Sequence, residues 1–525
     1  MIAIYFLLAF VSSAVLHLGN PYLTDDGTNY LRIAHNLFAG RGISINPGEA
    51  YLLNPPFYSV VVGLFAKLPF GGLEFWGSFV STLSFSLTLF PLFFLVRSVY
   101  GTKAAHWTCL LYLTNGFLLV YSHLVLSELL FIFLLMGLLY QAHRILQEEK
   151  PSLLSGVLLG LTGGLAYLTR PEGFLFFAAA FFVILFSAAS PYPSRLRVLL
   201  PSLAGFLVFL LPYFQMTYQK TGHWQLSGGV VPEMIRRVID VTHPGRYLEV
   251  KKIIEGLSTD KTRLRVDQLA EQFNLAGFLT SQDFMALLRS IPLALFSRVV
   301  EFNKYFFGGL GLFFAGACFL GTAWDGGRKR AELLLLSFLL PFGVHFFVVF
   351  DVRRYLPLYP IFLIWMGGGI EVMRNWAQKS FALGSKGSQA LVLSLCLALA
   401  LPSFAYVKRY FTATAFPFEH REMGLWMKDH LPRVEEETVV THRPFAAFYS
   451  GGRYAWLPYV DRLEDLLIYM HHLKARYFVV ADDLDTPVLD SYRFLLDETK
   501  DPPPPLKRVH VVHGAHQVIL YEIPT

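Results

Sequence analysis

Residues 76–97 read WGSFVSTLSFSLTLFPLFFLVR, a run without a charged side chain before its final arginine. A helix needs about 20 apolar residues to cross a hydrocarbon layer of ~30 Å, where it satisfies its own backbone groups. This run therefore predicts a transmembrane helix, and similar runs elsewhere in the chain bring the expected total to about eleven crossings. The other expected spans are 2–18, 104–121, 124–143, 153–169, 173–189, 198–218, 303–323, 333–350, 355–373 and 389–410.

Composition supports the same class, because 54% of the residues are hydrophobic and only 16% are charged. Charged residues are scarce across most of the first 410 positions and then become frequent, with the boundary near Phe411. We therefore expect a transmembrane domain over residues 1–411, with long connections at 19–75 and 219–302, and a separate domain over residues 412–525.

The last 114 residues alternate helical stretches with short runs rich in β-branched and aromatic residues, which is typical of a small α/β domain. We expect helices at 419–431, 462–475 and 488–499, and strands at 477–481, 509–512 and 517–522. In the 219–302 connection, apolar residues three and four apart predict surface helices at 234–255 and 281–300.

The orientation follows from lysine and arginine in alternate short loops. One set of loops holds Arg97, Lys103, Arg144, Lys150, Arg195, Arg197, Arg328, Lys329, Arg330, Arg374, Lys379 and Lys386. The other set holds Arg170, Arg353 and Arg354. The positive-inside rule makes the first set cytoplasmic, so an odd number of spans puts both long connections and the carboxy-terminal domain outside.

The net charge of +6 does not indicate a nucleic-acid partner, because most of the excess lies in these loops. The three cysteines, Cys109, Cys318 and Cys396, lie far apart inside apolar runs. They are typical of small buried hydrophobes and offer neither a disulfide framework nor a metal-ligand spacing.

The most informative polar stretch follows the first span and reads TDDGTNYLRIA at residues 24–34. Asp25 and Asp26 stand where the chain leaves the membrane and a helix opens. One interpretation is a helix cap, because Thr24, Asp25 or Asp26 can each accept from free backbone amides at a helix start. The other is a chemical role, and the surrounding sequence favours it.

A helix expected at Tyr30–Ala39 is followed by turns at Gly40–Gly42 and Asn46–Gly48 and by Asn54-Pro55-Pro56-Phe57-Tyr58 at the start of another apolar helix. This order resembles the GT-C superfamily of glycosyltransferases, over roughly residues 1–410. Its protein O-mannosyltransferase and lipid A aminoarabinose transferase branch is the most similar.

Further marks of the resemblance follow in order. Ser127-Glu128 opens the fourth span, Leu168-Thr169-Arg170-Pro171-Glu172-Gly173 joins the fifth and sixth, and Arg353-Arg354-Tyr355-Leu356-Pro357 leads into the tenth. The resemblance implies a GT-C-like fold and transfer of a sugar from a polyprenyl-phosphate carrier. No nucleotide-binding loop is needed for such a donor, and none is evident.

By resemblance, Asp25 is expected to be the general base, with Asp26 as an alternative base or an orienting group. A carboxylate can deprotonate an acceptor hydroxyl or amine. Arginine suits the departing phosphate, because its planar fork binds phosphate oxygens in pairs. We therefore expect Arg170, Arg353 and Arg354 near the phosphate, although arginines at helix ends also extend toward lipid headgroups without any further role.

Glu128 is expected either to meet an arginine or to touch the acceptor, and its alternative is an ordinary helix-start carboxylate. Glu172 and Tyr355, which flank the arginines, are expected to bind substrate. Arg32 and Tyr58 are weaker candidates for the same role.

Related oligosaccharide transferases hold a divalent ion on their acidic pair, so the resemblance allows a metal at Asp25 and Asp26. The sequence itself shows no convincing set of metal ligands. His471 and His472, on an expected amphipathic helix, are typical of solvated surface residues.

The expected partners are thus a polyprenyl-phosphate sugar, membrane lipids, and a lipid, glycan or protein acceptor on the outer side of a bacterial inner membrane. A transporter or lipid flippase is the main alternative, but such proteins commonly show internal repeats and broken helices, and neither is visible here. A scaffold whose tail binds a partner through residues 445–459 is a third hypothesis.

Overall fold

The computed structural model describes residues 1–19, 22–187, 191–222, 224, 310–320, 324–341, 352–382, 384–413, 417–458, 460, 462–484 and 486–523. The expected helices at 234–255 and 281–300 lie outside these residues. The described chain separates into two compact units. Of the described residues, the first holds those up to Tyr22, those from Asn54 to Trp224 and those from Leu310 to Ala413, and the second holds Leu23–Leu53 together with 417–523.

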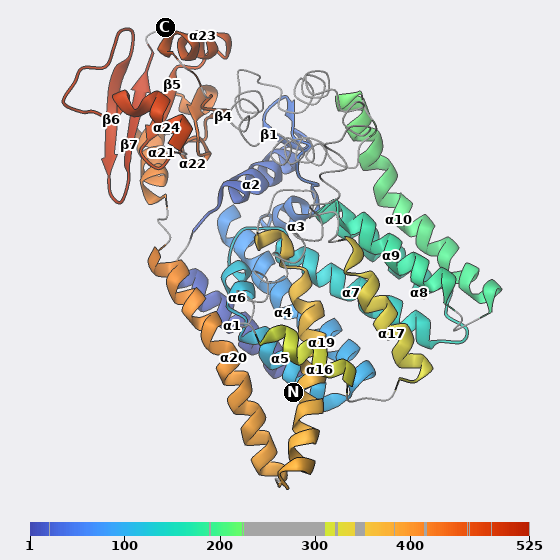
Figure 1. The fold of residues 1–525 in the computed structure, drawn as a ribbon. Coiled ribbons are helices and arrows are strands. Elements are labelled where there is room, and N and C mark those ends of the chain that lie inside the picture. The colour runs from blue at the N-terminus through green and yellow to red at the C-terminus, as the bar shows by residue number, and fades with distance from the viewer. Residues whose placement is uncertain are drawn as a thin grey trace, which may run out of the picture. The chain divides into compact units, whose positions relative to one another are not determined.

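The first unit is helical (Figure 1). Helix is found in the described part of each expected span, and the spans at 303–323 and 333–350 lie partly outside the described residues. Its helices are α1 (Ile2–Gly19), α3 (Phe57–Phe65), α4 (Leu73–Tyr100), α5 (Thr102–Leu113), α6 (Gly116–Ser122), α7 (Glu128–Gln147), α8 (Leu153–Thr169), α9 (Gly173–Phe186), α10 (Tyr192–Thr221), α16 (Gly311–Leu320), α17 (Gly326–Ser337), the 3₁₀ helix η2 (Val352–Tyr355), α19 (Leu358–Ser380) and α20 (Ser385–Ala413).

Within the described residues, α4, α7, α10 and α20 are long and apolar enough to cross a membrane, and α1, α8, α9 and α16 are shorter apolar helices. The apolar windows of α4 and α7 are mostly buried by neighbouring helices, whereas those of α10 and α20 are mostly exposed. Exposed leucines such as Leu200 and Leu401 suit a surface that faces lipid rather than water. The chain is a multi-pass membrane protein.

One expected span is interrupted. Residues 104–121 form two helices, α5 and α6, instead of one continuous helix. Asn115 ends the continuity because its side chain caps α6 by accepting from the Leu118 amide at 3.0 Å. This local capping outweighs the apolar composition that predicted a single helix.

The second unit is built on a mixed five-stranded sheet in the order β4-β3-β5-β7-β6. The strands are β3 (Thr438–Thr441), β4 (Arg453–Trp456), β5 (Tyr477–Ala481), β6 (Lys507–His513) and β7 (Gln517–Glu522). β3 runs parallel to β4 and β5, and β7 runs antiparallel to β5 and β6.

The other elements of this unit are α2 (Asp25–Phe38), β1 (Ser44–Asn46), β2 (Glu49–Ala50), α21 (Phe418–His430), η3 (Val434–Glu436), α22 (Phe445–Ser450), α23 (Leu463–His472), α24 (Thr486–Tyr492) and η4 (Arg493–Leu495). The expected strand at 477–481 and helices near 419–431 and 462–475 are confirmed. The helix expected at 488–499 is wrong in its end, because it tightens into η4 and stops at Leu495.

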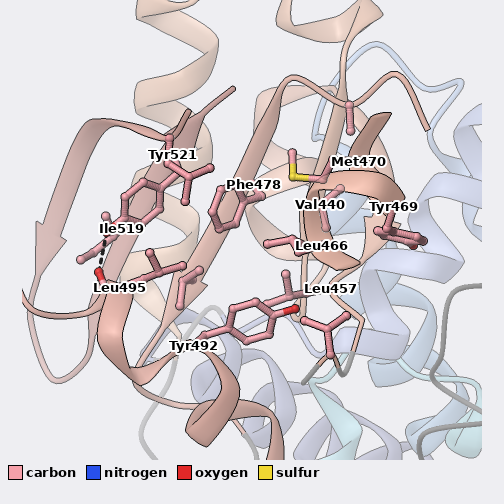
Figure 2. Packing of buried hydrophobic residues seen from close by; sticks show 14 of the residues in the cluster. Val440, Leu457, Leu466, Tyr469, Met470, Phe478, Tyr492, Leu495, Ile519 and Tyr521 are labelled. Carbon is pink, nitrogen blue, oxygen red and sulfur yellow. Dashed lines mark hydrogen bonds between the residues drawn. The ribbon is translucent and has the colours of Figure 1, made fainter. Parts of the chain in front are cut away.

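Side chains alternate between the two faces of the sheet, as the period of two requires. Val440, Phe478, Ile519 and Tyr521 pack toward α23 and η4 in one core (Figure 2). Their neighbours in sequence pack against α21 and α22 in a second core. The sheet is therefore covered on both faces, which gives a small three-layer α/β domain.

Candidate functional site

Among the described residues, the acidic pair and the expected arginines lie in two places, one in each unit. In the second unit, the acidic pair lies in the first turn of α2. The helix is capped by Thr24, whose Oγ1 accepts from the Gly27 amide at 2.9 Å. Because Thr24 serves as the N-cap, Asp25 and Asp26 occupy the first helical positions, where the helix dipole favours a negative charge.

Asp25 contacts an arginine that the sequence analysis did not name. Arg443 Nη1 donates to Asp25 Oδ2 at 3.3 Å, and Arg443 Nε donates to Asp483 Oδ2 at 2.8 Å. His420 Nε2 lies 3.1 Å from the other oxygen of Asp483. We call Asp25, Arg443, Asp483 and His420 the Asp25 chain.

The Asp25 chain runs from the interior of its unit to the surface. The His420 and Asp483 side chains are almost fully buried, whereas a third of Arg443 and half of Asp25 are exposed. Asp25 is thus the member that a substrate can reach, and the buried end holds the chain in place.

The surroundings shift the two carboxylates in opposite directions. Half of the Asp25 side chain is exposed, but desolvation by the surrounding protein raises its pKa to about 6. The positive charge of Arg443 opposes this rise in pKa, and the negative charge of Asp26 adds to it. Burial also acts to raise the pKa of Asp483, but the His420 hydrogen bond and the nearby cations outweigh it and hold that pKa well below its usual range. Asp483 therefore remains an anion, while Asp25 changes its protonation state near neutral pH.

In the first unit, Glu128 is the first residue of α7 and its side chain is fully buried. Its Oε1 accepts from Arg170 Nη1 at 2.9 Å and also from Arg353 Nε. Arg170 lies 3.4 Å from Glu172 as well. The structure thus brings Glu128, Arg170, Glu172 and Arg353 together, and we call these four residues the arginine cluster.

A break between α6 and α7 places Glu128, and hydroxyl groups of α4 hold this break. Ser78 Oγ donates to the His123 carbonyl at 2.6 Å, and Ser81 Oγ donates to the Leu126 carbonyl at 3.1 Å. These carbonyls are outside regular helix and would otherwise be unsatisfied in a dry interior. The serines three apart on one face of this span are the signal that could have identified this support.

The other expected residues lie in different surroundings. Arg32 donates to the carbonyls of Ile45 and Gly452, at 3.4 and 2.9 Å, so these contacts tie α2 to its own unit. Tyr58 is fully buried and its hydroxyl donates to the Gly77 carbonyl at 2.8 Å. Binding of substrate by Arg32 or Tyr58 stays a prediction.

Arg354 and Tyr355 directly follow Arg353 in η2. This places them on the same short helix as one member of the arginine cluster. Their contact with substrate also stays a prediction.

The metal that the resemblance allows does not fit the residues described here. Among them no three histidine, cysteine or carboxylate side chains gather as a ligand set. Beside Asp25 stands Arg443, a cation that already faces the carboxylate. No chemical step below therefore depends on a metal.

Comparison with known proteins agrees with the helical architecture. Residues 54–215 match the family described as dolichyl-phosphate-mannose-protein mannosyltransferase. This match covers 162 of the 525 residues, less than a third of the chain. The matched region contains Glu128, Arg170 and Glu172, whereas Asp25 lies before it and Arg353 after it. Comparison with curated sequences yields no significant match.

Solved structures of two membrane enzymes share the fold at low sequence identity. The oligosaccharyltransferase of Archaeoglobus fulgidus superposes with a TM-score of 0.62 at 16% identity, over 91% of this chain and 69% of that one. ArnT from Cupriavidus metallidurans, bound to undecaprenyl phosphate, superposes with a TM-score of 0.57 at 13% identity, over 99% of this chain and 96% of that one. The archaeal enzyme AglB in complex with an inhibitory peptide and a dolichol-phosphate gives 0.60 at 15% identity, over 91% and 69%.

Proposed function

We propose that this protein transfers a sugar from a polyprenyl-phosphate carrier to an acceptor outside the cytoplasm, with inversion at the anomeric carbon. The arginine cluster carries the proposal, because it holds two arginines on the buried Glu128 in the helical unit that contains the match to the mannosyltransferase family. The ArnT structure holds undecaprenyl phosphate and an AglB structure holds a dolichol-phosphate, which supports a donor of this chemical class.

The arginine cluster suits a departing lipid phosphate. When the bond between the anomeric carbon and the phosphate oxygen breaks, the phosphate gains a negative charge. Arg170 and Arg353 stay charged and present paired donors for phosphate oxygens. Glu128 holds both guanidinium groups in fixed positions, so little reorganisation is needed as the charge develops.

Asp25 is proposed as the general base. It takes the proton of the acceptor hydroxyl or amine while the acceptor atom attacks the anomeric carbon, and the bonding electrons leave with the phosphate. A carboxylate with a pKa near 6 is largely ionised at neutral pH and remains basic enough to accept the proton. Asp26 remains the alternative base or an orienting group.

We further propose about eleven crossings, with the acidic pair and the carboxy-terminal domain on the outer side of a bacterial inner membrane. The second unit supports this topology. Asn46 in the first connection pairs with Tyr454 in the sheet, donating to its carbonyl and accepting from its amide, both at 2.8 Å. Segments that pack together share one side of the membrane, so an even number of crossings separates them, as ten would.

The test uses purified protein in lipid nanodiscs with undecaprenyl-phosphate-[¹⁴C]mannose and a cell-envelope extract as the source of lipid, glycan and protein acceptors. Carriers with other hexoses or an aminopentose replace this donor in parallel reactions. We expect protein-dependent labelling of one acceptor class, and Asp25→Asn should reduce it at least about 100-fold. Asp501→Asn, at an exposed carboxylate, is the matched control and should transfer normally.

Full activity in Asp25→Asn would remove Asp25 from the mechanism. Wild-type protein that moves labelled carrier across a bilayer without forming any glycosidic product would instead support the flippase alternative. Mass spectrometry of envelope glycans from cells with and without the protein identifies the sugar and the acceptor.

A further inference from the structure

Arg443 links the acidic pair to the sheet of the second unit. It lies in the short segment between β3 and α22, where Thr441 Oγ1 donates to its carbonyl at 2.9 Å. Asp483 follows the end of β5 by two residues. Since β3 and β5 are adjacent and parallel, their carboxyl ends meet at one edge of the sheet, and this places Arg443 and Asp483 side by side.

Arg443 uses different nitrogen atoms to contact Asp483 and Asp25. Its Nε meets the buried Asp483, whose other oxygen is held by the buried His420, and its Nη1 extends to the exposed Asp25. In the described residues, His420 Nδ1 is buried without a hydrogen-bond partner, so Asp483 is the group that orients this ring. The buried Asp483 therefore fixes the guanidinium group of Arg443, which points toward the first turn of α2.

The charges around Asp25 come from several elements. Asp26 lies in α2, Arg443 follows β3, Asp483 follows β5, His420 lies in α21, and Tyr454 lies in β4. Of these, Arg443 is the cation in direct contact with the carboxylate. Its loss would leave Asp25 beside Asp26 and Asp483, two groups that disfavour a further negative charge.

We infer that Arg443 is a positioning residue that keeps Asp25 ionised and aimed, and that Asp483 and His420 hold Arg443 for this purpose. The inference rests on the proposed role of Asp25 as base. The carboxy-terminal domain would then position the base through Arg443, in addition to any contact that the domain makes with the acceptor. Arg443 itself does not touch the reacting atoms.

A thiol placed at residue 25 reports the effect of Arg443 without any substrate. The native cysteines Cys109, Cys318 and Cys396 are buried, so Asp25→Cys adds an accessible thiol. The rate of its reaction with methyl methanethiosulfonate, a neutral reagent, follows the thiolate fraction. We measure this rate from pH 5 to 10 in Asp25→Cys alone and combined with Arg443→Gln, Arg443→Lys or Arg453→Gln.

We expect Arg443→Gln to slow the reaction at pH 7 about threefold or more and to move the midpoint to higher pH, because the thiolate loses its cation. Arg443→Lys should keep most of the rate. Arg453→Gln is the matched control, since Arg453 lies in the same unit but pairs with Glu49 at 3.7 Å, and it should leave the rate unchanged. Equal midpoints for Arg443→Gln and Arg453→Gln would overturn the inference.

Asp483→Asn separates position from charge in the same assay. Deleting an anion near residue 25 would speed the thiol reaction if charge alone mattered. Release of the guanidinium from its anchor would slow it, and this is the result that we expect. Acceleration would remove Asp483 from the inference.

The transfer assay then connects the chemistry with the proposed function. With undecaprenyl-phosphate-[¹⁴C]mannose, or the carrier-linked sugar that wild-type protein turns over, Arg443→Gln should move the acidic limb of the rate profile to higher pH and recover activity above it. A uniform loss at every pH would indicate a merely structural role and would contradict the inference. Full activity in Asp25→Asn would instead contradict the proposed role of Asp25 as base. The thiol assay would still report whether Arg443 affects the group at residue 25.

Discussion

At the scale of single residues, Asp25 and Glu128 lie in different electrostatic environments. Asp25 lies at a helix start beside one cation and two anionic neighbours, so its protonation changes near neutral pH. Glu128 is buried beside two arginines and holds them together. The first arrangement suits a proton acceptor and the second suits a fixed receptor for an anion.

The proposed role of Asp25 as general base predicts a pH dependence of transfer. A base acts only when it is ionised, and its pKa is raised to about 6, so activity should rise with pH through a limb centred near that value. Initial rates at low donor concentration from pH 4.5 to 8.5 measure the limb in the free enzyme. A limb centred near pH 4, the ordinary aspartate range, would show that another group acts as base.

Replacement of Glu128 should affect stability as well as transfer. Glu128→Gln leaves two arginines facing each other in a largely buried position, so we expect the free energy of unfolding to fall by about 3 kcal/mol. Denaturant melts in detergent, together with donor KM, measure both effects. Glu148→Gln, which removes an exposed pair with Arg144, is the control and should change stability by less than about 1 kcal/mol. Similar losses of stability in Glu128→Gln and Glu148→Gln would show that burial does not determine how much these ion pairs contribute to stability.

At the scale of elements, α8 and α10 lie close enough for backbone to meet backbone. A Cβ atom added at Gly160 would stand 2.0 Å from the Ser202 carbonyl oxygen, and one added at Gly156 would stand 2.3 Å from the Val198 carbonyl oxygen. Small residues four apart permit this approach between membrane helices, where van der Waals packing replaces the hydrophobic effect.

Two alanine substitutions should therefore have opposite outcomes. Gly160→Ala forces α10 away and should lower the melting temperature in detergent, although alanine favours helix by about 1 kcal/mol over glycine. Gly137→Ala lies in α7, where the nearest atom, Thr162 Cγ2, is 3.8 Å from the added Cβ, so it should be neutral or stabilising. A Gly160→Ala variant as stable as wild type would show that the helices separate at little cost.

At the scale of the whole molecule, the first connection completes the sheet of the second unit. Asn46 satisfies the amide and carbonyl of Tyr454 on β4, the edge strand, and so covers an edge that would otherwise be unpaired. This pairing joins residues 408 positions apart in the sequence. It also requires that both segments lie on one side of the membrane.

Labelling of intact cells tests this topology. Cysteines introduced singly by Ala50→Cys and Asp501→Cys occupy exposed positions in the first connection and the carboxy-terminal domain. Both should react with a membrane-impermeant maleimide from outside, whereas Lys103→Cys, between α4 and α5, should react only after the membrane is opened. Opposite accessibility of residues 50 and 501 would contradict the structure of the second unit, and reaction of residue 103 from outside would reverse the orientation.

Sequence alone was sufficient for the features that depend on neighbours along the chain. Within the described residues, apolar length predicted helix in the expected spans, and a run of β-branched and aromatic residues predicted β5, because both follow from local composition. The short strands β3 and β4 and the helix α22 escaped prediction, since four to six residues carry too little periodicity. The same limit applies to the break at Asn115, where one capping side chain divides an apolar run.

The tertiary structure was needed for every contact between distant charges. Nothing in the sequence near Arg443 or Asp483 indicates a contact with Asp25. The parallel pairing of β3 with β5 brings these two residues together at one edge of the sheet, where His420 of α21 contacts Asp483. Likewise, Glu128 meets Arg170 and Arg353 across 42 and 225 positions of sequence. Electrostatic energy depends on distance through space, and only the packing of helices and strands sets that distance.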